Sequence, residues 1–284
     1  ATNDPALVEQ IGRATAEEIL ATGIPWNFSP VVAVVQDVRW GRTYEGFGED
    51  TVLVTTLGTA YVRGMQNLQP GDTPAPGQTI FTLATPKHFL GDGGTIWGSS
   101  RTSNMNVRYM LDQGNMQVPE ETVRQLYLPP YQSAVEAGAL NIMVSYSSWK
   151  DTKMHAQRGL LTDVLNGELG FKGFIVSDWQ AMDQIIPDDY YASIVASVNA
   201  GVDMNMVPYD YVKFIETLKS AVENGDVPEA RIDEAVRRIL RVKLSLGLFE
   251  HPMPDLKFQA TIRSREHLEL ARQAVRESLV LLKN

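Results

Sequence analysis

The stretch "GFIVSDWQAM", residues 173–182, decides the fold of this chain. Its apolar run, 174–176, follows a glycine and ends in a carboxylate and an indole, Asp178 and Trp179. An apolar run of this length next to a glycine is typical of a strand that is buried on both faces, as in a parallel sheet. Asp178 would then lie at the carboxyl end of the strand. The alternative is that Asp178 only caps the helix that follows.

The composition limits the class of protein. The chain has 284 residues, of which 44% are hydrophobic and 21% charged, and this is typical of a globular protein with a sizeable core. No run approaches the ~20 apolar residues that a membrane helix needs. The net charge of −9, without a basic block, argues against a nucleic-acid partner. The absence of cysteine excludes disulfides, thiolate metal sites and a cysteine nucleophile.

Strand-like and helical patterns alternate along the chain. The strand-like apolar segments are 28–35, 80–89, 140–149, 173–179 and 201–208. The segments with helical spacing between and after them are 119–138, 155–170, 190–201, 211–225, 228–249 and 265–284. Strands that alternate with helices imply βαβ units and a parallel sheet. The sequence therefore predicts an α/β fold.

Each of the first four strand-like segments delivers polar or aromatic groups at its carboxyl end. These groups are Asp37 with the stretch "RWGRTYEGFGED" (39–50), the pair Lys87-His88, Tyr146, and the pair Asp178-Trp179. In a parallel sheet or barrel, the carboxyl ends of the strands share one face, and ligands bind there. The sequence therefore predicts that these side chains form a single site.

The residue types at this predicted site suit a carbohydrate. An indole can lie against the apolar face of a sugar ring, and ionic groups make strong hydrogen bonds to sugar hydroxyls. Cleavage of a glycosidic bond needs two carboxyl groups, and one of them can act as a nucleophile. An aspartate with an ordinary pKa near ~3.9 is ionised at neutral pH, so Asp178 is the candidate nucleophile.

Several motifs together resemble glycoside hydrolase family 3. They are "RWGRTYEGFGED", "KHFLGDGGT", "SYSSW", "KMHA", "GFIVSDW", "AGVDMNM" and "RILRVKLSLGLFE", and they occur in the order of the family over essentially the whole chain. The resemblance is greatest to exo-acting β-glucan glucohydrolases and β-glucosidases. It implies hydrolysis of β-linked glucosides from the non-reducing end, with retention of configuration.

The resemblance also implies roles for individual residues. Asp178 matches the nucleophile of the family, and Trp179 matches part of an aromatic clamp for the next sugar. The residues that match those holding the hydroxyls of the terminal glucose are Arg42, Lys87, His88 and Tyr146. No cofactor is implied. No metal site is predicted, because His88 has no second histidine or carboxylate at ligand spacing.

The family fold is a (β/α)8 TIM-type barrel, and we expect this chain to hold only part of it. Residues 1–250 are expected to form a partial barrel that lacks the first βα units and their sugar-binding aspartate, since five strands are too few to close a barrel. Residues 251–284 are expected to form a linker and a helix that lead to an absent second α/β domain. The resemblance implies that this second domain supplies the acid/base glutamate. It also implies a periplasmic or secreted parent protein.

Two alternatives remain. The β-N-acetylglucosaminidase branch of the same family uses a histidine in the loop after the Lys-His strand, but the corresponding loop here, 91–100, contains no histidine. The other alternative is a barrel fragment that binds sugar without turnover. Of the other histidines, His155 is predicted to be a structural hydrogen-bonding residue, and His251 and His267 are predicted to lie at the surface.

Overall fold

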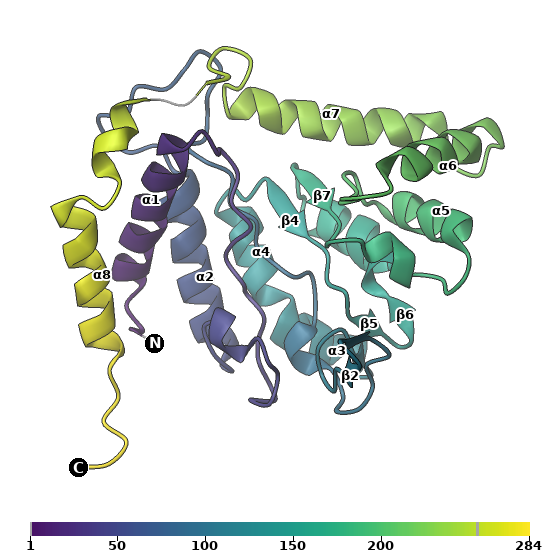
Figure 1. The fold of residues 1–284 in the computed structure, drawn as a ribbon, viewed down its shortest axis with the longest axis horizontal. Helices are drawn as coiled ribbons and strands as arrows, with labels where there is room; N and C mark the ends of the chain where they lie inside the picture. Colours follow the sequence, from purple (N-terminus) through teal and green to yellow (C-terminus); the bar gives the residue numbers. More distant parts are fainter. Residues whose placement is uncertain (1, 254–255) are drawn as a thin grey trace.

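The structure is a computed structural model that describes residues 2–253 and 256–284. Three helices of its first half lie side by side, namely α1 (Pro5–Ala21), α2 (Thr51–Gln66) and α4 (Pro129–Glu136) (Figure 1). The last helix, α8 (Arg265–Ser278), packs on the outer side of α1. Helices therefore cover one side of the central strand segments.

Parallel pairing joins the central segments in chain order. The strands β4 (Asn141–Met143) and β7 (Phe174–Val176) pair in parallel. Single parallel bridges join Trp26 to Leu83, Val31 to Lys87, Phe89 to Val144, and Val176 to Met204. The predicted α/β fold with parallel segments is therefore confirmed. The regular strands are shorter than the apolar runs predicted, and segments 28–35 and 80–89 pair only through single bridges.

Short strands connect the loops at the carboxyl ends of these segments. The strand β3 (Asn115–Met116) pairs in parallel with β5 (Ser148–Trp149), which pairs antiparallel with β6 (Thr152–Lys153). A separate hairpin joins β1 (Ser103–Asn104) to β2 (Val107–Arg108). The loops that follow two neighbouring parallel segments are therefore tied together.

The predicted helix over 119–138 forms, but it is interrupted. It consists of α3 (Glu120–Thr122), a π-helical segment (Val123–Tyr127) and α4. The interruption falls just before the prolines 129 and 130, which have no N–H to donate to the preceding turn. The N–H of Leu128 bonds instead to the carbonyl of Val123, five residues back, at 3.0 Å.

The other predicted helices also form. Residues Gly159–Glu168 are π-helical, and α5 (Tyr190–Ala200) ends as predicted at Gly201, whose φ of 118° is left-handed and suits glycine. The short 3-10 turns are Thr43–Glu45, Asp92–Gly94, Met154–Ala156, Ala181–Gln184 and Leu256–Thr261.

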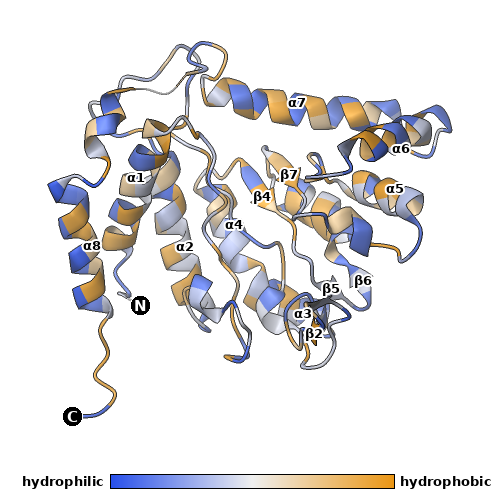
Figure 2. Ribbon diagram, viewed as in Figure 1, coloured by the Kyte–Doolittle hydropathy of each residue, from blue (hydrophilic) through white to orange (hydrophobic). Residues whose placement is uncertain are grey.

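The late helices α6 (Tyr211–Glu223), α7 (Glu229–Ser245) and α8 alternate hydrophobic and hydrophilic residues along their length (Figure 2). The predicted helix over 265–284 stops at Ser278, and the apolar residues 279–282 are extended and exposed. The prediction that His267 is a surface residue is wrong. Its Nδ1 lies 2.9 Å from Oε1 of Glu18, and its side chain is largely buried against α1.

The main core lies between the helices and the parallel segments. Its fully buried members include Val32, Val34, Phe89, Ile142, Leu161 and Ile175. These residues come from four of the five parallel segments and one of the helices, so the alternating pattern of the sequence is what builds the core. In the described part of the chain, no helix is both long and apolar enough to cross a membrane.

We expect Gly64→Ala to destabilise the chain through the contact between α1 and α2. A Cβ atom at position 64 would lie 2.0 Å from the carbonyl oxygen of Glu9, so the two helices would have to separate. Overpacking of this kind costs about 1–3 kcal/mol, and urea denaturation would measure it. The control is Gly159→Ala, where an added Cβ meets nothing within 4 Å. Equal stability of the two variants would contradict the expectation.

Candidate functional site

Asp178 follows β7 after one intervening residue, Ser177, and its side chain is largely buried. Oδ1 accepts a hydrogen bond of 2.7 Å from the backbone N–H of Trp179. Oδ2 is buried and has no hydrogen-bond partner among the described residues. The 3-10 turn that follows has Gln180 as its N-cap and no side-chain cap. The alternative that Asp178 is a helix cap is therefore wrong.

His88 is the nearest charged or titratable neighbour of this free oxygen. Its Nε2 lies 3.6 Å from Oδ2 of Asp178 and 3.3 Å from Nη2 of Arg42. Its Nδ1 lies 2.7 Å from Oδ2 of Asp92, so this carboxylate accepts the Nδ1 proton and fixes the orientation of the ring. Nε2 is thereby held towards Asp178.

Asp92 is fully buried beneath His88 and is also held by two hydroxyls. Its Oδ1 accepts hydrogen bonds from Ser145 and Ser147. Burial acts to raise the pKa of Asp92, but His88 and the Ser145 hydrogen bond outweigh it, so the pKa is lowered and the carboxylate stays ionised. A buried anion that is satisfied in this way is a stable support for the imidazole.

The glycine-rich loop 91–94 places Asp92. A Cβ atom at Gly93 would lie 2.1 Å from the carbonyl oxygen of Val34, so only glycine allows this approach. The carbonyl of Gly93 accepts a 2.9 Å hydrogen bond from the N–H of Gln36. The loop is therefore bound to the neighbouring parallel segment, and it serves to position a side chain.

Arg42 and Lys87 bring positive charge to the same site. Arg42 makes a bidentate ion pair with Glu45, with its Nε and Nη2 at 2.8 and 2.7 Å from the two carboxylate oxygens. Burial acts to lower the pKa of Arg42, but Glu45 and the nearby carboxylates outweigh it and raise the pKa. For Lys87, burial and the charge of Arg42 lower the pKa, against the opposing effect of Asp178.

Tyr146 and His155 lie on the other side of Asp178. Burial and the charge of Asp178 raise the pKa of the Tyr146 phenol, which therefore stays protonated and can donate a hydrogen bond. His155 is buried, and burial together with Lys153 and His88 lowers its pKa to about 3. Its neutral Nε2 accepts the backbone N–H of Asp178 at 3.1 Å. This is the structural hydrogen-bonding role that the sequence predicts for His155.

The structure thus brings together the polar residues predicted from the sequence. Arg42, His88 and Asp178 are joined by short contacts, and the charge of Asp178 acts on Lys87 and Tyr146. Trp179 is 49% exposed and lies at the rim. Three carboxylates were not predicted, namely Glu45, Asp92 and Asp112. The only signal for Asp92 was an acidic residue inside a glycine-rich loop after a strand.

Asp112 lies near the same cluster. Its Oδ1 accepts a hydrogen bond of 2.8 Å from the indole Nε1 of Trp40. Burial and the charge of Asp92 raise its pKa, against the Trp40 hydrogen bond and the charge of Arg42. Trp40 is itself buried, so this pair anchors the stretch 37–42 that carries Arg42.

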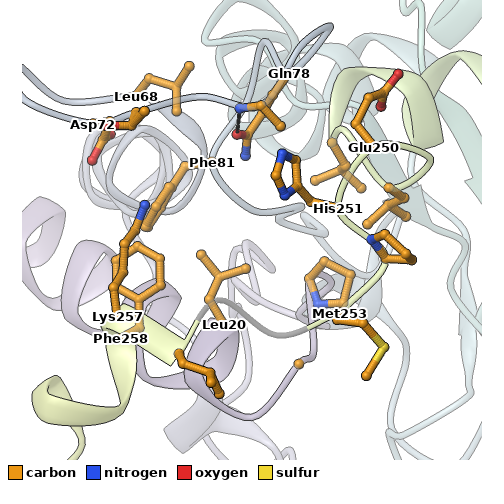
Figure 3. Close-up of a pocket in the computed structure, with 18 residues that line it drawn as sticks. Leu20, Leu68, Asp72, Gln78, Phe81, Glu250, His251, Met253, Lys257 and Phe258 are labelled. Atoms are coloured by element: carbon orange, nitrogen blue, oxygen red, sulfur yellow. Dashed lines mark hydrogen bonds between the residues drawn. The ribbon is translucent and has the colours of Figure 1, made fainter.

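A cavity of about 690 Å³ lies elsewhere in the structure (Figure 3). Its lining includes Leu20, Pro25, Gln78, Phe81, His251 and Phe258, and none of the predicted site residues. Pro25 and Gln78 precede the first and second parallel segments, so the cavity lies at their amino ends. The candidate site is at their carboxyl ends.

We expect Asp178→Asn to raise the melting temperature at neutral pH. Burial raises the pKa of Asp178, against the effects of His88 and the Trp179 N–H, so the folded chain disfavours the charged form. The pKa of Asp178 is therefore higher in the folded chain than in the unfolded chain, and ionisation of Asp178 lowers the stability of the fold. This loss is complete at a pH above the folded-state pKa and absent at a pH below the unfolded-state value of about 3.9. The gain should therefore disappear as the pH falls below about 4. Thermal unfolding from pH 3 to 8 would measure it.

Glu168→Gln is the control for this measurement, because Glu168 is exposed and its pKa is lowered by Arg124. It should give no gain at neutral pH. A lower melting temperature for Asp178→Asn than for the unsubstituted chain at pH 7 would contradict the expectation.

Comparison with known proteins shows what the whole chain is similar to. The chain is 36% identical to the lysosomal beta glucosidase of Dictyostelium discoideum over 281 residues, which is 95% of this chain and 32% of that protein. Its structure is similar to the exo-1,3/1,4-beta-glucanase ExoP from a Pseudoalteromonas species, with a TM-score of 0.85 and 40% identity over 100% of this chain and 34% of that one. It is also similar to a beta-glucosidase from Listeria innocua in complex with glucose, with a TM-score of 0.86 and 33% identity over 100% of this chain and 37% of that one.

The chain spans about a third of the length of these proteins. The model of the family described as "Glycosyl hydrolase family 3 N terminal domain" matches residues 1–242, which is most of the chain. The resemblance inferred from the motifs is thereby confirmed, and the chain belongs to glycosyl hydrolase family 3.

Proposed function

We propose that this chain carries the nucleophile and the glucose-binding site of a retaining, exo-acting β-glucosidase or β-glucan glucohydrolase. The observation that carries the proposal is the free Oδ2 of Asp178, which is buried and has no hydrogen-bond partner among the described residues. Oδ1 is fixed by the Trp179 N–H, so Oδ2 is oriented and has a lone pair available for attack. The similar protein from Listeria innocua is a beta-glucosidase whose crystal structure is in complex with glucose, and this supports a glucoside as the substrate class.

In the proposed reaction, Oδ2 of Asp178 attacks the anomeric carbon while the bond to the leaving oxygen breaks. The result is a covalent glycosyl-enzyme, which water then hydrolyses. The nearby cations, Arg42 and Lys87, stabilise the ionised form of Asp178 and can bind sugar hydroxyls, because charged donors make the stronger hydrogen bonds. His88 and Tyr146 offer two further polar groups to the same ring.

The first half of this reaction is what the chain can supply. The carboxylates Glu45, Asp92 and Asp112 are bound to Arg42, His88 and the Trp40 indole, so we assign the proton of the leaving oxygen to none of the three. We infer that the acid/base is a glutamate from a second α/β domain outside this chain. We also infer that the five parallel segments, in residues 1–250, are part of a (β/α)8 barrel, and that 251–284 leads toward that domain.

The test is covalent trapping. A dinitrophenyl 2-deoxy-2-fluoro-β-glucoside has a leaving group that needs no proton, and its fluorine slows hydrolysis of the intermediate. Mass spectrometry should find one added sugar on the peptide that contains residues 173–182. A dinitrophenyl 5-fluoro-N-acetyl-β-glucosaminide, whose fluorine is at C5 because C2 carries the acetamido group, should leave the chain unlabelled. Labelling of a different carboxylate would contradict the proposal, and binding of glucosides without any labelling would favour the sugar-binding fragment.

A further inference from the structure

The rim of the site contains a second exposed aromatic side chain, Tyr209, which the family motifs do not mark. Its ring centroid lies 6.1 Å from that of Trp179, and the two ring planes meet at 84°. Trp179 is 49% exposed and Tyr209 is 68% exposed. The two rings are roughly perpendicular and both are open to solvent, so they form two adjoining aromatic surfaces. One of them, Trp179, directly follows Asp178 in the chain. We call this pair the aromatic corner.

The aromatic corner is held in place by the backbone of two neighbouring parallel segments. The N–H of Ser177 bonds to the carbonyl of Met204 at 2.9 Å, and the N–H of Gln180 bonds to the carbonyl of Met206 at 3.0 Å. The N–H of Met206 also bonds to the hydroxyl of Ser177 at 2.7 Å. Only two residues, Val207 and Pro208, separate this paired backbone from Tyr209. The backbone that carries the two rings is therefore fixed, which lowers the entropy cost of presenting them to a ligand.

The chemistry of the corner suits a neutral sugar. Aromatic rings offer apolar faces to the C–H faces of a pyranose, and the phenol adds a polar edge for hydroxyls. In the proposed function the glucose to be cleaved contacts Asp178, and the family resemblance assigns Trp179 to the unit on the leaving-group side. Tyr209 lies beside Trp179, perpendicular to it and more exposed, so its ring is available to the unit after that.

We propose that Tyr209 is a specificity-determining residue that binds the second sugar unit on the leaving-group side, and so favours oligosaccharides of three or more β-linked glucose units over disaccharides. The inference rests on the proposed function, because it places Asp178 at the cleaved bond. It adds a chain-length preference to that function and a residue that determines it.

The test compares dissociation constants for laminaribiose and laminaritriose by isothermal titration, in an Asp178→Asn background that prevents turnover. With Tyr209 present, the trisaccharide should bind more tightly than the disaccharide. Tyr209→Ala should reduce this preference by about fivefold to tenfold, which is the size expected for one aromatic contact. Tyr209→Phe should keep the preference within about twofold, because it keeps the ring.

The matched control is Tyr211→Ala, because Tyr211 is 59% exposed two residues away and opens α6. It should leave the preference unchanged. An unchanged preference in Tyr209→Ala would overturn the inference, and so would an equal loss of affinity for both sugars. If neither sugar binds the chain that retains Tyr209, the proposed function is wrong and the inference that rests on it is wrong too. If the sugars bind but the change at Tyr209 leaves their preference unaltered, only the inference is wrong. The two failures are therefore distinguishable.

Discussion

Asp178→Asn is expected to abolish covalent labelling and to lower the rate of aryl β-glucoside cleavage by roughly 10⁴–10⁶-fold, the range seen when a nucleophile or its partner is removed. The amide is nearly the same size as the carboxylate but has no negative oxygen to attack the anomeric carbon. Release of dinitrophenolate, followed by absorbance, would measure the rate, and intact mass would measure the labelling. The free Oδ2 of Asp178 is the physical basis of this expectation.

The control for this experiment is Glu168→Gln, which removes a carboxylate that is exposed and paired with Arg124 at 2.7 Å. It should label as fast as the unsubstituted chain. Labelling that persists in Asp178→Asn would show that another carboxylate is the nucleophile. The melting temperature of Asp178→Asn, expected to rise at neutral pH, separates a loss of chemistry from a loss of folding.

Arg231→Met is expected to destabilise the chain by about 3–5 kcal/mol, because it leaves a buried carboxylate without its cation. Nη2 of Arg231 lies 2.5 Å from Oδ1 of Asp203, and both side chains are largely buried. Oδ2 of Asp203 accepts a 2.9 Å hydrogen bond from the N–H of Ile175 in β7. The pair therefore fastens α7 to β7, which precedes the proposed nucleophile Asp178, and labelling at Asp178 should also slow.

The pH dependence and a double variant test this explanation. Burial raises the pKa of Asp203, against Arg231, so the folded chain tolerates the neutral form. Without Arg231, the loss in the free energy of unfolding should be full at neutral pH, where Asp203 is charged. It should become smaller as the pH falls towards about 3.9, the pKa of an aspartate in the unfolded chain. Asp203→Asn combined with Arg231→Met should recover part of the loss.

Arg237→Met, in the same helix, is the matched control. Its pair with Asp233 is exposed on both sides, and pairs of this kind contribute about 0–1 kcal/mol. Urea denaturation would measure all three variants. A loss for Arg231→Met no larger than that for Arg237→Met would contradict a structural role for the buried pair.

The sequence by itself determined which segments belong to the parallel sheet and which residues end them. The apolar runs that end at Tyr146 and Asp178 could be read locally, because burial on both faces requires a continuous run of apolar residues. The motifs around Arg42, Lys87 and His88 could be read in the same way. The π-helical segments were not predictable from periodicity, because they depend on hydrogen bonds that change by a single residue of register.

Only the tertiary structure decided the partners of these residues. Asp92 supports His88 because the glycine-rich loop packs on a neighbouring segment, and Asp203 meets Arg231 because α7 crosses β7. Tyr209 lies beside Trp179 for the same reason, since two strand ends adjacent in space are about thirty residues apart in the chain. Local patterns report which face of an element is buried. They carry no information about which distant side chain fills the space opposite, because topology and packing set that contact.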